Sequence, residues 1–490
     1  FKMYRIISLL VLISISYCNG YKIAIFTADI SASQVIFSKR TAETLARAGH
    51  EVVLYRIRSL EYSNVKVSFN ESLITEVFTS SCKKLIKNTQ FRKELKLQKF
   101  DLAFAHPYDY CTVGLIHDAE IPSWIWLNSG KLHDMIAYDI GLPSPSSYVP
   151  VVMANSGDRM TFSQRLVNFI ARIILPILTP MMIINKETAL FKKYIRKDFP
   201  DLRDLAKECP LIMVNSHELY DFPQPLFSKI IYIGGLGMLE ENQEKLQEPL
   251  KSVIDNSSIS VIFSLGTVIN STHMPNEWKQ ALIRAFGRFP NVQFFVRYEG
   301  NDLHDIASKN IFISKWFPQS TLLRHPKLKL FITHGGYNSL QEAVYSAKPL
   351  ILIPLFGDQK RNAHLAEKLG FGYRLEKGRI TENSLYLAIK TVLENSSYTD
   401  SVKSLHRMVM KRPFTAEETL VKWTEFVAEF RDLSNMKPVG IDLNFIEYHN
   451  IDVITFICGS FVFVFYFLHK ITSKLFKIFY FHINLKSKIE

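Results

Sequence analysis

Short apolar runs alternate with amphipathic segments along most of the 490 residues, and this alternation limits the possible folds more than any other feature. From residue 21 to about 216, the runs KIAIF, EVVLYRI, FDLAFA, PSWIWL and LIMVNS predict strands, and stretches such as SKRTAETLARAGH between them predict helices. Strands separated by helices form βαβ units, in which the strands lie parallel. The first half of the chain is therefore predicted to be a doubly wound α/β domain.

A second series of the same kind follows IIYIGGLG, near residue 235. Its predicted strands are SISVIFS, VQFFVRY, IFISKW, LKLFIT and PLILIP, and its helices include NEWKQALIRAFGRF and QKRNAHLAEKLG. Two such domains facing each other leave a cleft between the carboxyl ends of their strands, which is where open α/β sheets bind ligands. We therefore expect two domains, at residues 21–235 and 236–450, with a site between them.

An apolar run in the first domain, FIARIILPILTPMMII at residues 169–184, is a candidate for a membrane segment. It contains Arg172, Pro176 and Pro180, and proline interrupts a helix by removing a hydrogen-bond donor. The sequence therefore predicts a broken helical hairpin, either packed on the domain or dipping into a membrane face.

The two ends of the chain predict its topology. Residues 1–20 have a basic start, an apolar stretch and small residues at the end, which is the pattern of a secretory signal peptide. Residues 453–468, VITFICGSFVFVFYFL, carry no charge and are followed by a basic segment, as in a transmembrane helix with its lysines on the cytoplasmic side. We predict a signal peptide at 1–20, a transmembrane helix at 451–470 and a cytosolic tail at 471–490.

The formal net charge of +13 is concentrated partly at these ends. Lys2 and Arg5 stand in the predicted signal peptide, and the last twenty-one residues hold five lysines and one acid, which leaves +7 for the rest. A nucleic-acid-binding protein would need a basic face with interleaved aromatic residues and no signal peptide. The sequence therefore predicts no nucleic-acid partner.

Cysteines and glycosylation motifs are compatible with a lumenal body. Outside the two predicted end segments only Cys82, Cys111 and Cys209 remain, an odd number without metal-site spacing, so the body is not expected to be built on disulfides or on a metal. Four N-x-S/T motifs could carry glycans in that compartment, at Asn70, Asn256, Asn270 and Asn395.

The residues with the clearest chemistry lie between 316 and 362. The strand LKLFIT is followed by the tight turn His334-Gly335-Gly336 and then by a helix, an arrangement that directs backbone N–H groups and a helix dipole at an anion such as a diphosphate. Glu342, one turn into that helix, can accept hydrogen bonds from the hydroxyls of a ribose. Trp316 offers an aromatic face to a base. Together these groups predict a nucleotide-sugar site.

The order of these residues resembles a known signature. The pattern W-x-P-Q, H-P, F-x-T-H-G-G-x-N-S-x-x-E and P-x-x-x-D-Q-x-x-N is similar to the donor-binding segment of the UDP-glycosyltransferases, the UDP-glucuronosyltransferase family. The resemblance extends over essentially the whole chain and is most specific in the second domain. It implies a GT-B fold, with two facing Rossmann-like domains, and transfer of a sugar from a UDP-sugar to a small lipophilic acceptor with inversion. The UDP-sugar is a co-substrate, and no cofactor is implied.

The resemblance also implies roles for individual residues. The uracil would lie on Trp316 and Gln319, and Glu342 would bind the ribose. The diphosphate would be bound by His334, Gly336, Asn338 and Ser339. Ser264 and Thr267 would belong to the phosphate loop that faces them. Asp358 and Gln359 would bind the sugar hydroxyls.

The sequence departs from the family at the catalytic base. Inverting transfer to a hydroxyl needs a general base, which in the family is a histidine in the first strand–helix loop, oriented by a carboxylate from a later strand. Aligned on AETLARAGH, that position holds Gln34, which cannot accept the proton. The carboxylate position holds His106, with Asp109 three residues later.

Three interpretations follow from this departure. The enzyme uses acceptors that need no base, such as amines or ionised carboxylates; or His106 replaces the base, oriented by Asp109; or the protein binds UDP-sugar or a lipophile but transfers poorly.

The last residues bear on localisation. Lys486 and Lys488 resemble a dilysine retrieval signal, so we expect a single-pass type I protein of the endoplasmic reticulum membrane with lumenal domains. The donor sugar, the acceptor and a homo- or hetero-oligomeric state are left open.

Overall fold

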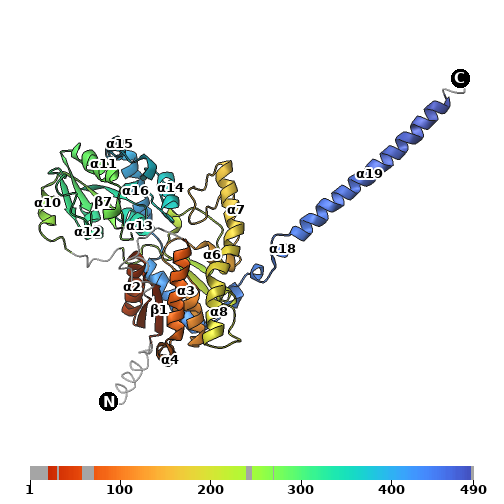
Figure 1. Cartoon of the computed structure of the whole chain (residues 1–490), viewed down its shortest axis with the longest axis horizontal. Helices are drawn as coiled ribbons and strands as arrows, with labels where there is room; N and C mark the ends of the chain where they lie inside the picture. The colour runs from red at the N-terminus through yellow and green to blue at the C-terminus, as the bar shows by residue number, and fades with distance from the viewer. Residues whose placement is uncertain (1–19, 30–31, 58–70, 239–244, 269, 487–490) are drawn as a thin grey trace, which may run out of the picture. The chain divides into compact units, whose positions relative to one another are not determined.

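Two parallel six-stranded sheets form the framework of the protein (Figure 1). The computed structural model describes residues 20–29, 32–57, 71–238, 245–268 and 270–486. The strand order is β2-β1-β3-β4-β5-β6 in the first sheet and β12-β11-β10-β7-β8-β9 in the second. The predicted pair of doubly wound α/β units is therefore confirmed. The strands of the first sheet are β1 (Lys22–Ala28), β2 (Glu51–Ile57), β3 (Leu102–Ala105), β4 (Trp124–Asn128), β5 (Leu211–Val214) and β6 (Ile230–Tyr232), and those of the second are β7 (Ile259–Ser264), β8 (Val292–Arg297), β9 (Ile311–Ser314), β10 (Leu328–Thr333), β11 (Leu350–Leu352) and β12 (Gly372–Arg374).

The central strands are apolar because helices cover both faces of each sheet. Every residue of β3, β4 and β5 is buried, so these strands read as continuous apolar runs without polar alternation. The helices of the first half are α2 (Ala32–Arg47), α3 (Glu71–Lys87), α4 (Thr89–Leu97), α5 (Cys111–Asp118), α6 (Asp134–Asp139), α7 (Phe162–Thr179), α8 (Asn185–Tyr194) and α9 (Leu202–Lys207), and those of the second half are α10 (Leu250–Asn256), α11 (Asn276–Gly287), α12 (Gln319–Arg324), α13 (Tyr337–Tyr345), α14 (Gln359–Lys368), α15 (Glu382–Glu394), α16 (Ser396–Met410) and α17 (Ala416–Phe430).

Helix α17 packs on the first sheet although it follows the second one in sequence. Leu420 and Val427 of this helix belong to the same buried cluster as Ile25 of β1 and Phe104 of β3. The chain therefore crosses back to the first domain after residue 416. The domain limits predicted at residues 235 and 450 stay predictions, and this crossing shows that the halves share their packing.

The proline-containing apolar run forms one long helical segment instead of the predicted hairpin. Helix α7 continues through a π-helical turn (Pro180–Ile184) directly into α8. A π turn accommodates a proline because its hydrogen bonds have a different spacing from those of an α-helix. The expected reversal of the chain is wrong, and most of α7 is exposed, with only Asn168 and Pro176 buried.

A disulfide joins Cys82 of α3 to Cys111 of α5, with their Cα atoms 5.7 Å apart. The sequence analysis expected a body that is not built on disulfides, and this bond is therefore a feature that the odd cysteine count did not predict. Cys209 is buried and free. Among the glycosylation motifs, Asn256, Asn270 and Asn395 are exposed. The predicted signal peptide, apart from Gly20, and the motif at Asn70 lie outside the described residues.

Residues 438–490 form a separate compact unit. It contains the short helix α18 (Phe445–Tyr448) and the long helix α19 (Ile451–Lys486). By length and apolar composition, two helical segments of the described chain are long enough to cross a membrane, at residues 162–194 and 451–478. The second includes the whole predicted transmembrane segment.

Candidate active site

The turn after β10 is built to receive an anion. Gly335 has a φ of +87°, a left-handed conformation that favours glycine, and it reverses the chain sharply between the strand and α13. Helix α13 begins at Tyr337 after Gly336, and no side chain caps its first N–H groups. Uncapped N–H groups and the helix dipole both favour a phosphate at this end. Asn338 and Ser339 lie in the first turn, so the predicted diphosphate residues are brought together.

His334 is held against a second glycine turn after β7. A Cβ atom on Gly266 would lie 2.5 Å from Cε1 of the imidazole, so the side chain fits only because residue 266 is glycine. Burial, and then the charge of Arg297, lower the pKa of His334 to about 4, and the ring is neutral at physiological pH. Ser264 is buried at the end of β7 and Thr267 is exposed three residues later.

The start of α14 is tied to the same turn. Asn362 donates one hydrogen bond to the carbonyl of Gly335 (3.0 Å) and another to the Asp358 carboxylate (2.8 Å). The side-chain oxygen of Gln359 accepts hydrogen bonds from the N–H groups of Leu355 and Phe356, at 2.8 and 3.1 Å. The predicted sugar-binding pair therefore stands beside the predicted diphosphate turn.

The predicted nucleoside residues are close to one another. Nε2 of Gln319, the first residue of α12, donates a 2.5 Å hydrogen bond to Oε2 of Glu342 in α13. Trp316 is 58% exposed and its ring lies 5.1 Å from the Arg297 guanidinium, so a large part of its aromatic surface is open to a ligand. Burial raises the pKa of Glu342, partly opposed by its hydrogen bond with Gln319.

Hydrogen bonds connect this donor site directly to the first domain. Asn338 donates to the carbonyl of Ser33 (3.3 Å) and accepts from Asn215 (3.1 Å), which also donates to the carbonyl of Ser129 (3.0 Å). The first turn of α2 and the segment after β5 therefore contact the start of α13, and the loop after β4 is linked to it through Asn215. Gln34, which follows Ser33 in α2, is hydrogen-bonded to Tyr108. Its assignment to the position of the base stays a prediction.

A cavity of about 810 Å³ occupies the first domain. This volume suits a small organic molecule. Its wall is mainly apolar and is made largely by α7 and the turn after it, with Val167, Ala171 and Leu175 among the lining residues. Polar groups enter it from two strand ends: Tyr108 after β3, and His133 and Asp134 after β4.

Tyr108 lies between this cavity and the residues predicted to bind the donor. Its hydroxyl is hydrogen-bonded to Ser129 (2.6 Å) and to Gln34, and it lies close enough to Asp358 to feel its charge. Burial raises the pKa of Tyr108 to about 12, so the phenol keeps its proton. The sequence interpretation missed both Tyr108 and His133, although each follows a predicted strand at the carboxyl edge, which is the available signal.

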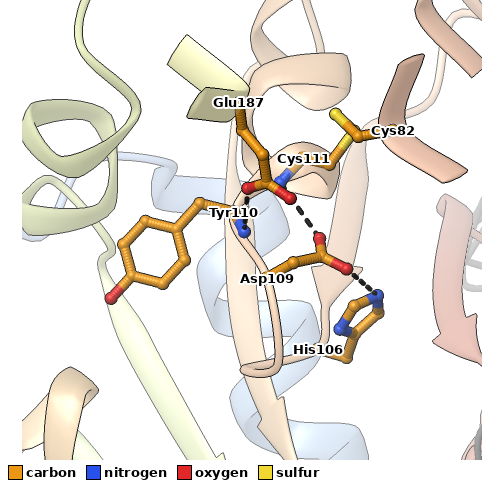
Figure 2. Close-up of a disulfide and its surroundings, with 6 residues drawn as sticks. All are labelled: Cys82, His106, Asp109, Tyr110, Cys111 and Glu187. Carbon is orange, nitrogen blue, oxygen red and sulfur yellow. Dashed lines mark hydrogen bonds and ion pairs between the residues drawn. A yellow bond between two sulfur atoms is a disulfide. The ribbon is translucent and has the colours of Figure 1, made fainter. Parts of the chain in front are cut away.

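His106 and Asp109 are brought together (Figure 2). The imidazole is 5% exposed, its Nδ1 accepts a weak hydrogen bond from the N–H of Tyr108 (3.4 Å), and its Nε2 is 3.8 Å from the Asp109 carboxylate. Asp109 faces Glu187 of α8, and burial followed by mutual repulsion raises the pKa of Glu187 strongly. Neither His106 nor Asp109 is among the residues lining the cavity.

Within the described part of the chain, no group of three or more His, Cys, Asp or Glu side chains is placed to hold a metal ion. The polar groups described above are instead suited to a phosphorylated organic ligand.

Comparison with known proteins agrees with this geometry. The family model "UDP-glucoronosyl and UDP-glucosyl transferase" matches residues 16–487. The chain belongs to this family. It is 31% identical to mouse UDP-glucuronosyltransferase 1A6 over 395 residues, covering 79% of this chain and 72% of the mouse protein. It is 28% identical to ugt-50 of Caenorhabditis elegans over 487 residues, covering 90% and 92% of the two chains.

Solved structures show the same fold. The glycotransferase of kitacinnamycin superposes with a TM-score of 0.59 at 16% identity, covering 86% of this chain and 99% of that one. LpCGTa, solved in complex with UDP, superposes with a TM-score of 0.56 at 14% identity, covering 83% and 99%. This member of the family is therefore a glycosyltransferase with the GT-B fold, as the resemblance implied.

Proposed function

We propose that this family member transfers glucose or glucuronate from a UDP-sugar to a small lipophilic acceptor held in the α7 cavity, with inversion at the anomeric carbon. The observation that carries the proposal is the position of Tyr108, which borders the cavity while its hydroxyl lies near Asp358 at the start of α14. An acceptor in the cavity would thus stand beside the sugar.

The transfer forms a bond from the acceptor heteroatom to the anomeric carbon and breaks the bond from that carbon to the UDP oxygen. UDP leaves with the electron pair, and the N–H groups at the start of α13 stabilise the charge that develops on the diphosphate. Asp358 and Gln359 orient the sugar, and the face of Trp316 supports the uracil.

We further propose that the chain acts in the lumen of the endoplasmic reticulum, as a single-pass type I membrane protein. Support comes from the apolar segment at 451–478 and from the basic residues that follow it. The exposed sequons at Asn256, Asn270 and Asn395 are compatible with that compartment.

A second candidate function is favoured by one observation, the glutamine at the position of the family's base. A protein that binds UDP-sugar without efficient transfer would also keep the donor turn. The two candidates differ in turnover, since both predict donor binding.

The test measures transfer from radiolabelled UDP-glucose and UDP-glucuronate to a phenol and to a tertiary amine, with the full chain in detergent micelles. The proposal expects product with at least one donor–acceptor pair. Absence of product with every pair, together with phenol transfer gained on Gln34→His, would favour the binding protein.

A pair of variants in α7 tests the place of the acceptor. Ala171 lines the cavity, so Ala171→Phe is expected to raise the acceptor KM at least tenfold while the UDP-sugar KM stays within twofold. Ile173 is exposed on the same helix and does not line the cavity, so Ile173→Phe is the matched control. Equal effects of the two variants would place the acceptor elsewhere.

A further inference from the structure

The loop after β4 contains a histidine that neither the family resemblance nor the sequence pattern had singled out. His133 precedes α6 and borders the acceptor cavity, together with Tyr108 from the loop after β3. Strands β1, β3 and β4 are neighbours in the sheet, so their carboxyl ends open onto the same edge. Gln34, His106 and His133 therefore follow three adjacent strands, and of these three only His133 lines the cavity.

Four residues earlier, at Ser129, the same loop is linked through Asn215 to the start of α13. Ser129 is hydrogen-bonded through its hydroxyl to Tyr108 and through its carbonyl to Asn215, which in turn binds Asn338 at the start of α13. Because four residues separate Ser129 from His133, the two can be at most about 14 Å apart. Here the N–H of His133 donates to the side chain of Asn128 (3.2 Å), which folds the loop back towards the end of β4. His133 is thereby held close to the junction of cavity and donor site.

The imidazole of His133 has one nitrogen that is unpartnered within the described part of the chain. Its Nδ1 is enclosed by protein and has no hydrogen-bond partner among the described residues. The ring as a whole is half-buried and borders the cavity. Since Nδ1 is shielded, Nε2 is the nitrogen that an acceptor in the cavity can reach.

Three neighbouring polar groups, Gln34, Tyr108 and Asp134, are poorly suited to be the base for a hydroxyl acceptor. Gln34 is an amide, and burial keeps Tyr108 protonated by raising its pKa to about 12. Asp134 accepts a 2.7 Å hydrogen bond from Val152 and faces the Arg172 guanidinium at 3.9 Å, so its oxygens are already engaged.

From this arrangement we propose that His133 is the general base of this enzyme, replacing the histidine that Gln34 has displaced. Nε2 takes the proton of an acceptor hydroxyl while the oxygen attacks the anomeric carbon and UDP leaves with the bonding electron pair. The imidazolium then releases its proton to solvent as product departs. This assignment rests on the proposed transfer reaction and adds hydroxyl-bearing acceptors, phenols above all, to its substrates.

The charges around His133 are consistent with this role. Burial lowers its pKa, Asp134 opposes that shift and Lys131 adds to it, so the ring is neutral and able to accept a proton at neutral pH. From the other packed elements, Arg172 of α7 pairs with Asp134, and Tyr108 faces the same cavity. The negative charge of Asp134 would stabilise the imidazolium formed in the transition state.

The test compares His133→Gln with the native chain, using a phenol and a tertiary amine as acceptors. General-base catalysis contributes about 10²–10⁴-fold, so kcat for the phenol is expected to fall by that factor. Transfer to the amine, which needs no base, and the affinity for UDP are expected to stay within twofold. The rise of kcat/KM with pH for the phenol should disappear in the variant. His117→Gln, on the exposed surface of α5, is the matched control and should change neither reaction.

The outcomes separate the two proposals. Phenol transfer by His133→Gln within twofold of the native rate would overturn the role of His133 and leave the transfer reaction standing. No transfer by the native chain to any acceptor would overturn both. If His133→Gln also loses affinity for UDP, a rescue experiment with His133→Ala and added free imidazole separates the two effects. Restored phenol transfer supports the assignment of His133 as the base, and no restored transfer overturns it.

Discussion

Arg361 of α14 and Asp221, which follows β5, form a buried ion pair between the two halves of the chain. The Arg361 side chain is 1% exposed and that of Asp221 3%. Ser216 also donates a hydrogen bond to Asp221 (2.7 Å), and the guanidinium lies 4.8 Å from the ring of Phe222. Replacing Arg361 with methionine preserves the apolar packing and leaves the carboxylate buried without its main partner.

Loss of one member of a buried pair costs about 3–5 kcal/mol, because the remaining charge is desolvated and uncompensated. We therefore expect Arg361→Met to lower the free energy of unfolding by about that amount at pH 7. The matched control is Arg288→Met. Arg288 is half-exposed beside Glu382, where an ion pair contributes about 1 kcal/mol or less.

The pH dependence of this loss gives a second, independent check. Burial raises the pKa of Asp221, but Arg361 and Lys131 outweigh burial and hold it below its usual value of 3.8. In the native chain the pair therefore stabilises the fold above that value, and this stability is lost as the pH falls through the lowered pKa. In Arg361→Met, burial raises the pKa of Asp221. The carboxylate therefore takes up a proton at a higher pH than in the native chain, and this protonation removes the cost of burying an unpaired charge.

Thermal and urea unfolding of the full chain in detergent, at pH 7 and pH 4.5, measures both effects. We expect the difference in unfolding free energy between the native chain and Arg361→Met to be smaller at pH 4.5 than at pH 7. A loss below about 1 kcal/mol at pH 7, or an equal loss at both pH values, would refute the reasoning. The double variant Arg361→Met with Asp221→Leu should recover much of the stability, since no buried charge is then left.

Two further predictions follow from local geometry. Gly266→Ala places a methyl group against His334 at a left-handed φ of +77°, so UDP affinity is expected to fall at least tenfold by calorimetry, whereas Gly378→Ala, in open space, should not change it. Cys82→Ser removes the disulfide, which links residues 29 positions apart. By loop entropy we expect the variant to lose about 3–4 kcal/mol of unfolding free energy. Unfolding of this variant and of the reduced native chain should show the same loss, and a loss under about 1 kcal/mol in both would contradict the entropic argument.

The sequence alone predicted most of the architecture because parallel strands have a local signature. Runs such as LAFA and LIMV are continuously apolar since helices cover both faces of the sheet. The segment at 316–362 that is predicted to bind the donor was also recognisable, because its residues follow one another along the chain and the geometry of a strand, a glycine turn and a helix is local. The prediction of a hairpin at residues 169–184 was wrong because the helix continues through a π turn that begins at Pro180. Such a turn depends on the hydrogen-bond register of the backbone more than on composition.

What the sequence determined by itself was the two-sheet plan and the strand, glycine turn and helix at residues 328–345. The missing base at Gln34 stays a prediction. Only the tertiary structure decided which side chains share a cavity. His106 and His133 each follow a buried strand by a few residues, yet the first is enclosed beside Asp109 and the second borders the cavity. Whether a side chain lines the cavity depends on the packing of α7 and on contacts between residues more than a hundred positions apart, such as Asn215 and Asn338. Such contacts cannot be predicted from a local sequence pattern.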